Sequence, residues 1–346
     1  AKGVSNTQPT LMLIDGHSLA FRAFYALPVD SFQTQSGQYT NAIHGFIAML
    51  INLLGAEQPD SIAVAFDISR HSFRTDEYPE YKGTRGETPA EFKGQVPLLQ
   101  EALHAMGIRT IEKENYEADD ILATLATQGA EAGFRVLVVS GDRDTIQLVD
   151  ERITLLYPSK QGVSELTRYD TAKVLERYGI RPEQYPEIAA LVGETSDNLP
   201  GVPKVGEKTA VKWINQFGSL EEILRRQDEI GGKVGESLRE HAHLAERNRR
   251  LNRLVRDVDL DLSVDQLERG NIDMAAVQVG ELRQIVVIEV PADEEIAGSG
   301  QRYVVINPEI VRASQEEEIG LEGCLSVPGY AGDVARSVSI FVRGMD

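Results

Sequence analysis

The chain has 346 residues, enough for two or three domains, and 54 acidic against 35 basic side chains give it a formal net charge of −19. This charge argues against a generally basic coat for nucleic acid and against binding to anionic membranes, although local basic patches remain compatible with it. Its single cysteine, Cys324, excludes a disulfide framework and a cysteine-rich zinc module. No signal-peptide core and no apolar run of about 18 residues occur, so we expect a soluble cytoplasmic protein.

After a disordered lead over residues 1–9, apolar runs repeatedly end in aspartate. The aspartates follow TLMLI, SIAVAF and RVLVV, and they are Asp15, Asp67, Asp142 and Asp144. Continuous apolar runs are typical of buried parallel strands, and ligands bind at the carboxyl ends of such strands. We therefore predict an α/β domain over residues 10–170, with a helix around 41–55 and acidic side chains gathered at one sheet edge.

Two further acidic motifs fit the same edge. EADD opens a predicted helix with Glu117, Asp119 and Asp120, and GETSDN supplies Glu194 and Asp197. Crowded carboxylates repel one another unless a cation neutralises them, and oxygen-only ligands favour Mg²⁺ or Mn²⁺. Any single one of these residues is more often a cap, a turn residue or solvated surface. The joint pattern favours a shared metal site.

The segment 69–95 interrupts the α/β pattern. Its cations alternate with aromatic residues, and the cations are Arg70, Arg74, Lys82, Arg85 and Lys93. We interpret the segment as too polar for a core element, and a long irregular segment in a compact domain is usually functional or disordered. Two alternatives stay open. The segment is a solvated loop, or it is an arch whose cations grip phosphate while its aromatic rings stack on bases.

Residues 171–257 are predicted to be mainly helical and to carry a glycine-rich turn, LPGVPKVGEKTA, between two helices. Glycines before a helix can present backbone N–H groups to a phosphate, and lysines add charge. Such turns are also common without any ligand. Beyond them, residues 258–283 are acidic and poor in aromatic residues, which indicates a linker, and residues 284–346 are rich in predicted strands.

At this point the motifs resemble a known family. LIDGHSLAFRAFYAL, AVAFD, FRTDEYPEYKGTR, YEADDILATLA, VVSGDRDTIQLV, GVSELTRYD and SDNLPGVPKVGEKTA occur in order over about residues 10–260. They resemble the 5′-nuclease domain at the front of bacterial DNA polymerase I and the related flap endonucleases. The resemblance implies a mixed central sheet of the PIN/5′-nuclease type, a helical arch over 69–95 and a helix–two-turn–helix DNA clamp.

Matched motif by motif, the resemblance also implies roles for individual residues. The implied metal ligands are Asp15, Asp67, Glu117, Asp119, Asp120, Asp142, Asp144, Glu194 and Asp197. Arg74 and Lys82 match the catalytic arch cations that hold the scissile phosphate. The implied DNA contacts are Arg22, Arg70, Arg85, Gly201, Lys204, Gly206, Lys208 and Thr209. Two positions depart from the family pattern, since Glu194 stands where aspartate is frequent and Lys204 where glycine is usual.

The expected activity is that of a 5′-3′ exonuclease and 5′-flap endonuclease in DNA replication and repair. Two ions, Mg²⁺ or Mn²⁺, would share the work, one making a hydroxide nucleophile from water and the other stabilising the leaving oxygen. The expected partner is DNA with 5′ ends, flaps or nicks, bound by a monomer, and a monovalent cation at the helix–two-turn–helix is considered. The alternatives are a PIN-like RNase and a DNA-binding module without catalysis.

The segment 284–346 resembles part of a different family. IVVIEVPADEE, YVVINPEIV and EGCLSVPG are similar to the middle of peptide deformylase, in which the cysteine of EGCLS is a metal ligand. The other two ligands there come from an HExxH helix, and no HExxH occurs in this sequence. One soft ligand cannot make a three-ligand catalytic site. We therefore expect no deformylase activity and a poorly stable appendage.

Overall fold

The computed structural model describes residues 8–34, 36–158, 166–267, 285–289, 302–323 and 331–345. The chain separates into two compact units, residues 1–270 and residues 271–346, and each is described by itself.

The first unit is built on a six-stranded sheet in the order β3-β2-β1-β4-β5-β6. Its strands are β1 (Thr10–Asp15), β2 (Ser61–Ala65), β3 (Arg109–Ile111), β4 (Arg135–Val139), β5 (Ile153–Pro158) and β6 (Leu166–Tyr169). Five strands run parallel, and only β6 is antiparallel to its neighbour β5. Every residue of β1 and β2 is buried, as expected for central strands covered on both faces. The predicted mixed α/β class is confirmed.

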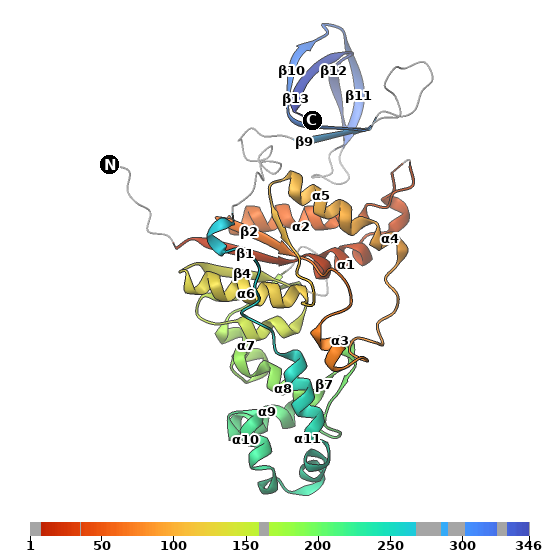
Figure 1. Ribbon diagram of the computed structural model, residues 1–346. Coiled ribbons are helices and arrows are strands. Elements are labelled where there is room, and N and C mark those ends of the chain that lie inside the picture. Colours follow the sequence, from red (N-terminus) through yellow and green to blue (C-terminus); the bar gives the residue numbers. More distant parts are fainter. Residues whose placement is uncertain are drawn as a thin grey trace, which may run out of the picture. The chain divides into compact units, whose positions relative to one another are not determined.

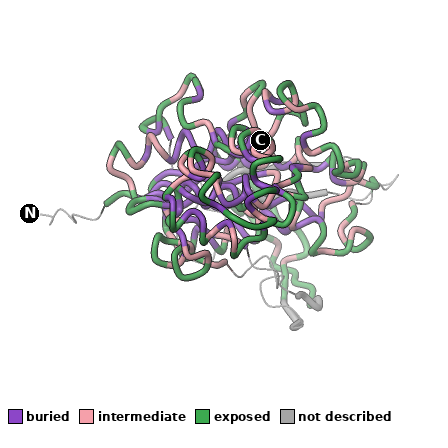
Figure 2. The backbone as a smooth tube through the Cα atoms, turned by 90° about the horizontal axis from the view of Figure 1, so that it is seen from below, coloured by how far each residue is buried: buried purple, intermediate pink, exposed green. Residues whose placement is uncertain are grey.

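Helices cover both faces of this sheet (Figure 1). On one side lie α1 (Gly16–Ala26), α2 (Asn41–Glu57) and α5 (Gln95–Ala105), and on the other lie α6 (Ala118–Glu131) and α7 (Thr171–Tyr178). Figure 2 shows the buried residues gathered in the interior of this unit. The helix α1 was absent from the predicted elements, whereas α2 matches the helix predicted around 41–55.

The segment between β2 and α5 contains the short helices α3 (Phe73–Glu77) and α4 (Ala90–Lys93). The expectation that it is too polar to join a core is wrong at Arg74, Tyr81 and Phe92, all of which are buried. Tyr81 packs with Leu199 and Leu251, and the Phe92 ring lies against rings of α1. The middle and the C-terminal end of this segment, which we call the arch, are therefore fixed to the folded unit.

The region that follows is mainly helical and packs beside the sheet domain. Its elements are α8 (Tyr185–Val192), β7 (Gly193–Glu194), η4 (Thr195–Asp197), β8 (Leu199–Pro200), α9 (Glu207–Phe217), α10 (Leu220–Arg225) and α11 (Gly232–Asn252). The strands β7 and β8 form a short antiparallel hairpin that places Glu194 opposite Leu199. Asn248 of α11 donates hydrogen bonds to the carbonyls of Ala190 and Pro200, which ties α11 to this hairpin.

The second unit contains only strands among its described residues. They are β9 (Ile285–Glu289), β10 (Arg302–Ala313), β11 (Glu317–Gly323), β12 (Ala331–Ser337) and β13 (Ile340–Met345), arranged as a β13-β10-β9 sheet and a β11-β12 pair. The apolar side chains of Ile310, Ile319 and Phe341 are more than half exposed. Cys324 lies outside the described residues. In the described parts of the chain, no helix is both long and apolar enough to span a membrane.

Candidate metal centre at the carboxyl edge of the sheet

The strand ends bring the predicted aspartates to one edge of the sheet. Asp15 ends β1 and caps α1, accepting a hydrogen bond from the Ser18 backbone N–H at 2.9 Å. Asp67 follows β2 and accepts from the Ala118 N–H at 2.7 Å, which fixes it beside the start of α6. Asp142 follows β4 and caps the short helix η2 (Arg143–Leu148) by accepting from the Asp144 N–H.

Asp144, Glu194 and Asp197 form a group that could hold a metal ion. One carboxylate oxygen from each residue lies within 4.8 Å of the others. The Asp144 Oδ1 and Glu194 Oε2 atoms are buried and have no hydrogen-bond partner. Buried polar atoms without partners are costly, and a cation between these oxygens would satisfy them. The residues present therefore fit a divalent ion bound by oxygen ligands.

The other predicted acidic ligands surround this group more loosely. No second group of three with the same close spacing occurs among the described residues. Burial, reinforced by the charge of Asp67, raises the pKa of Asp15 to about 7. Burial and the charges of Asp142 and Asp15 raise the pKa of Asp119 well above its usual range, and its Oδ1 atom has no hydrogen-bond partner. A bound cation would therefore also stabilise the ionised forms of these two carboxylates.

The charge of Asp142 acts both on the close group of Asp144, Glu194 and Asp197 and on the more loosely placed Asp119. Burial and the charges of Asp142 and Asp197 raise the pKa of Glu194 to about 7. Burial, then the charges of Glu194 and Asp142, raise the pKa of Asp144 well above its usual range. The same Asp142 charge raises the pKa of Asp119 on the other side. A substitution at Asp142 should therefore change the pKa values of Asp119, Asp144 and Glu194.

Two arch cations already contact the cluster. Lys82 Nζ lies 2.6 Å from Glu117 Oε2, and Arg85 Nη2 lies 2.7 Å from Asp197 Oδ1. Burial alone would raise the pKa of Glu117, but the nearby charges of Lys82 and Arg74 outweigh it and hold that pKa below its usual value. Lys82 was predicted to be a catalytic cation, whereas Arg85 was expected among the DNA contacts and instead reaches a predicted metal ligand.

Arg74 does not have the environment predicted for a phosphate-binding side chain. It is 1% exposed, and its guanidinium pairs with both carboxylate oxygens of Asp120 at 2.7 and 2.8 Å. It also donates to the carbonyls of Leu251 and Arg253 at 2.6 and 3.0 Å. The internal bonds of Arg74 occupy its donors, so a direct phosphate role for Arg74 stays a prediction that its burial does not favour.

Asp120 is likewise separated from the proposed metal ligands. It is fully buried, and besides Arg74 its oxygens accept from the backbone N–H groups of Glu117 and Val255. In this structure Asp120 serves as the internal counter-ion of Arg74, and its predicted role as a metal ligand stays a prediction. Glu117 and Asp120 do lie close together, as their spacing predicted, but Asp120 faces inward while Glu117 meets Lys82.

The predicted DNA contacts in the arch and in α1 differ in their surroundings. Arg70 is exposed and donates to the carbonyls of Arg85 and Gly86, so it organises the arch itself. Arg22 lies beside Gly141, where an added Cβ would come within 3.2 Å of its Nη2 atom. Arg22 is thus placed at the loop that carries Asp142.

The remaining predicted DNA contacts lie in the turn between β8 and α9. Gly201 packs so closely on α8 that an added Cβ would lie 2.2 Å from the Val192 carbonyl, which gives it a packing role. Lys204 adopts a left-handed conformation with φ +69°, a conformation that glycine tolerates better. Gly206 is the N-cap of α9, and Lys208 and Thr209 lie in the first turn of that helix.

Several residues that position the carboxylates had not been predicted. Ser140 Oγ donates to Asp15 Oδ2 at 3.0 Å and accepts from the Asp142 N–H at 3.1 Å. A small hydroxyl residue at the end of an apolar strand, directly before GDRD, was a signal that could have identified it. The Tyr81 hydroxyl lies 3.5 Å from Asp197 Oδ2, and the sequence alone offers no signal that this pair should meet.

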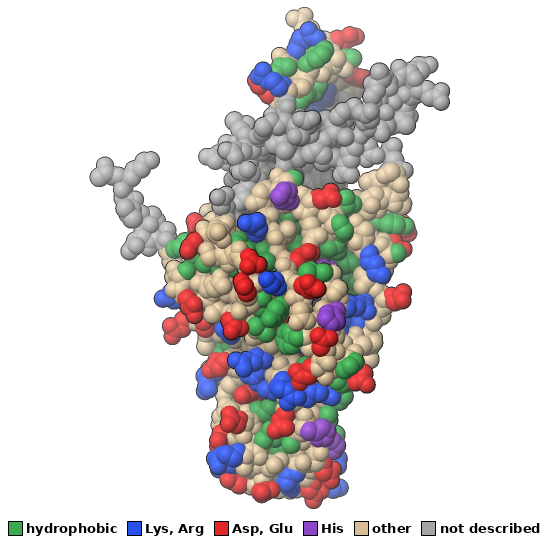
Figure 3. Space-filling view, in the orientation of Figure 1, with side chains coloured by type: hydrophobic (Ala, Val, Ile, Leu, Met, Phe, Trp, Pro, Cys, Tyr) green, Lys and Arg blue, Asp and Glu red, His purple; other side chains and the backbone are tan. Residues whose placement is uncertain are grey.

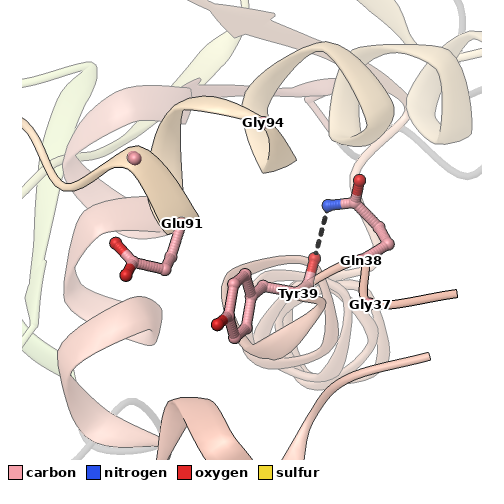
Figure 4. Close-up of a pocket in the computed structure, with 6 residues that line it drawn as sticks. Gly37, Gln38, Tyr39, Glu91 and Gly94 are labelled. Carbon is pink, nitrogen blue, oxygen red and sulfur yellow. Dashed lines mark hydrogen bonds between the residues drawn. The ribbon is translucent and has the colours of Figure 1, made fainter. Parts of the chain in front are cut away.

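A small cavity lies elsewhere in the first unit (Figure 4). It measures about 260 Å³ and is lined by Gly37, Gln38, Tyr39, Ala90, Glu91 and Gly94. Glu91 is its only charged side chain, so it lacks the convergent carboxylates found at the sheet edge.

The charged surface in Figure 3 shows acidic and basic side chains mixed, with Lys and Arg gathered over the junction of α8 and α11.

Two models of known protein families match the first unit of the chain. Residues 10–179 match the model of the 5′-3′ exonuclease N-terminal resolvase-like domain, and residues 180–275 match that of the 5′-3′ exonuclease C-terminal SAM fold. Residues 10–275 belong to the 5′-3′ exonuclease family. The resemblance to the 5′-nuclease domain is thereby confirmed.

Curated relatives of this 5′-3′ exonuclease region are named DNA polymerase I. The protein from Mycobacterium tuberculosis (strain ATCC 25618 / H37Rv) is 55% identical over 267 residues, covering 77% of this chain and 29% of the relative. The protein from Bacillus caldotenax is 43% identical over 291 residues, covering 82% of this chain and 33% of the relative. The chain thus spans about three tenths of the length of the curated relatives that it matches.

Solved structures share the fold of this 5′-3′ exonuclease region. The phage T5 5′-exonuclease with bound zinc is 22% identical, with a TM-score of 0.59, and covers 71% of this chain and 90% of that chain. A complex of the bacteriophage T5 flap endonuclease with DNA and metal ions is 21% identical, with a TM-score of 0.59, and covers 71% and 89%. At these identities the likeness establishes the fold alone.

Proposed function

We propose that residues 10–275 act as a divalent-metal-dependent 5′ nuclease that cleaves DNA at 5′ ends and flaps. The observation that carries this proposal is the group formed by Asp144, Glu194 and Asp197, with oxygens within 4.8 Å and buried atoms without partners. Membership of the 5′-3′ exonuclease family supports the same chemistry. The polymerase activity suggested by the relatives' names is not part of the proposal, because the match covers only 29% of their length.

The metal is proposed to be Mg²⁺, with Mn²⁺ as a substitute, because every predicted ligand is a carboxylate. The close group would hold one ion, and the looser acidic residues would hold a second, chiefly Asp15, Asp67 and Asp119, with Glu117 and Asp142 nearby. Bound ions would supply an activated water and would offset the charge that develops on the leaving oxygen. The zinc-bound T5 5′-exonuclease structure, which has the same fold, supports a divalent ion.

The arch cations have a separate task in this proposal. Lys82 and Arg85 are held beside the cluster by ion pairs with Glu117 and Asp197. Once those carboxylates have other counter-ions, both side chains are free to bind the scissile phosphate. Charge-assisted hydrogen bonds to a phosphate that gains charge in the transition state accelerate the chemical step more than they strengthen binding.

DNA with 5′ ends, flaps or nicks is the proposed substrate, with replication and repair as the setting. The T5 flap endonuclease complex contains DNA and shares this fold, which supports the choice. Lys204, Lys208 and Thr209, before and within the first turn of α9, are proposed to contact the backbone of duplex DNA, with a monovalent cation considered beside them. A monomeric, cytoplasmic protein remains a prediction.

The test is cleavage of a labelled 5′-flap DNA in Mg²⁺, compared with single-stranded and blunt duplex controls. We expect Mg²⁺-dependent release of short products from the flap, inhibition by chelator, and no turnover by the Asp144→Asn variant. A flap made wholly of RNA separates the alternative of a PIN-like RNase. Equal cutting of the RNA flap would favour that alternative, and wild-type turnover by Asp144→Asn would contradict the proposed metal centre.

A further inference from the structure

The loop that carries the metal-ligand candidate Asp197 is joined to the arch by a set of hydrogen bonds. The backbone N–H of Lys82 donates to the Asp197 carbonyl at 2.9 Å, and Asn198 Nδ2 donates to the Glu80 carbonyl at 2.8 Å. Arg85 adds a bond to the Ser196 carbonyl at 3.1 Å. The loop 196–198 and the arch residues 80–85 therefore form one continuous hydrogen-bonded unit.

Both central residues of this unit have an uncommon backbone conformation. Lys82 has φ +57° and Asn198 has φ +56°. Asparagine tolerates the left-handed region well, whereas a long side chain such as lysine seldom adopts it. Strained conformations persist where the surroundings impose them, and they concentrate at functional sites. Two hydrogen bonds hold Lys82 in this conformation. One joins its own N–H to the Asp197 carbonyl, and the other joins the Asn198 amide to the carbonyl of Glu80, two residues earlier in the arch.

The backbone conformation at Lys82 decides where its ammonium group lies. With φ +57°, the side chain leaves the arch toward the cluster, and Nζ reaches Glu117 Oε2 at 2.6 Å. With a different backbone conformation at Lys82, this long side chain would leave the arch in a different direction. The Asn198 amide is therefore placed to determine whether Lys82 points at the carboxylates at all.

We propose that Asn198 is a positioning residue that acts through Lys82, holding the arch in the conformation that presents this cation to the scissile phosphate. The inference rests on the proposed nuclease function. It also couples the metal centre to the phosphate-binding cation, because Asp197 supplies both a carboxylate to the cluster and a carbonyl to the Lys82 backbone.

The decisive variant is Asn198→Gly, which keeps the left-handed conformation accessible and removes only the amide. The matched control is Gln58→Gly, another left-handed residue with φ +46°, located at the end of α2 before β2. We expect Asn198→Gly to lower the single-turnover cleavage rate of flap DNA at least tenfold, with DNA affinity changed less than threefold. Gln58→Gly should leave both quantities unchanged.

A double-mutant cycle with Lys82→Ala tests whether Asn198 acts through Lys82. In the Lys82→Ala background, adding Asn198→Gly should lower the rate less than twofold further. Hydrogen exchange of the metal-free protein gives a readout independent of activity, since the amide of Lys82 should exchange at least tenfold faster in Asn198→Gly. If Asn198→Gly does not fold, Asn198→Asp serves instead, because aspartate also tolerates φ +56° but cannot donate to the Glu80 carbonyl.

Additive rate losses in the cycle would overturn the inference, as would unchanged exchange at Lys82. A wild-type protein without metal-dependent cleavage would instead contradict the proposed function. The hydrogen-exchange comparison would then still decide whether Asn198 holds the arch.

Discussion

At the scale of single residues, Arg74 differs most from its predicted role. Removing it leaves Asp120 as a buried carboxylate without its counter-ion, although two backbone N–H groups still donate to it. Breaking a buried ion pair from one side costs about 3–5 kcal/mol. We expect Arg74→Ala to lower the free energy of unfolding by this amount in urea titrations. The double variant Arg74→Met/Asp120→Leu should recover part of the loss. A stable Arg74→Ala protein with weakened DNA binding would instead support the direct phosphate role.

Lys82 provides the contrasting case, because its side chain is partly exposed and faces the cluster. We expect Lys82→Ala to leave the free energy of unfolding within about 1 kcal/mol of wild type. Its single-turnover cleavage rate should fall on the order of a hundredfold, with a much smaller change in DNA affinity. Rapid-quench kinetics and equilibrium binding measure the two quantities. A loss confined to affinity and its salt dependence would mean that Lys82 only attracts the DNA backbone.

The raised carboxyl pKa values predict how the stability of the metal-free protein depends on pH. Asp15 and Glu194 have pKa values of about 7 in the folded state, above their usual range, so the folded state binds more protons than the unfolded state. Their stabilising contribution is complete below pH 4 and is lost as the pH rises through 7. In chelator, the free energy of unfolding should fall by roughly 2–3 kcal/mol for each of these two groups, or about 5 kcal/mol together, between pH 5 and 8. A rise over that interval would contradict the assignment.

Asp142→Asn is the variant that tests the coupling within the cluster. Because the Asp142 charge raises the pKa of both Glu194 and Asp119, its removal should stabilise the metal-free fold and flatten the pH dependence. Cleavage should be abolished, while flap-DNA affinity stays within about tenfold of wild type, because the cations proposed to bind phosphate remain. Urea titrations at two pH values and a binding assay measure these effects. Near-normal turnover at saturating Mg²⁺ would remove Asp142 from the proposed site.

At the scale of elements, the turn before α9 combines a strained backbone with a proposed phosphate contact. Lys204→Gly relieves the left-handed conformation at φ +69°, which offsets the greater flexibility of glycine, so thermal stability should change little. The same substitution removes one positive charge. We expect the slope of log affinity against log salt concentration for duplex DNA to decrease by about 0.9. An unchanged slope would indicate that Lys204 makes no phosphate contact.

The strands were the elements best predicted from sequence. Strands buried on both faces read as continuous apolar runs, and the aspartates at or just beyond the ends of β1, β2 and β4 do reach one edge. The arch was harder to predict from sequence, because the polar groups of its buried residues bond to partners that are distant along the chain. Arg74 pairs with Asp120 and donates to carbonyls 177 and 179 residues away along the chain. Such distant contacts cannot be predicted from the local composition of the arch. The close grouping of Asp144 with Glu194 likewise depends on the β7–β8 hairpin.

At the scale of the whole molecule, the division into two units predicts that the nuclease is separable. The first unit ends near residue 270 and the matched family region ends at residue 275. Deleting the chain after residue 278 should preserve flap cleavage and raise solubility, because the deleted strands expose apolar side chains such as Ile319 and Phe341. Cleavage rate and soluble yield are the measurements. A truncated protein that stays folded by circular dichroism but loses cleavage would make residues 279–346 part of the enzyme.

The scattering of the acidic cluster along the chain has a consequence for protein synthesis. Asp15 is the first of these carboxylates to leave the ribosome, whereas Glu194 and Asp197 follow about 180 residues later. At typical translation rates of roughly 5–20 residues per second, the nascent chain spends about 10 seconds or more with its sheet partly made and its ligand set incomplete. A ribosome stalled before residue 194 would therefore carry a nascent protein unable to hydrolyse the nucleic acids around it. The candidate metal centre can therefore form only after Asp197 has been synthesised.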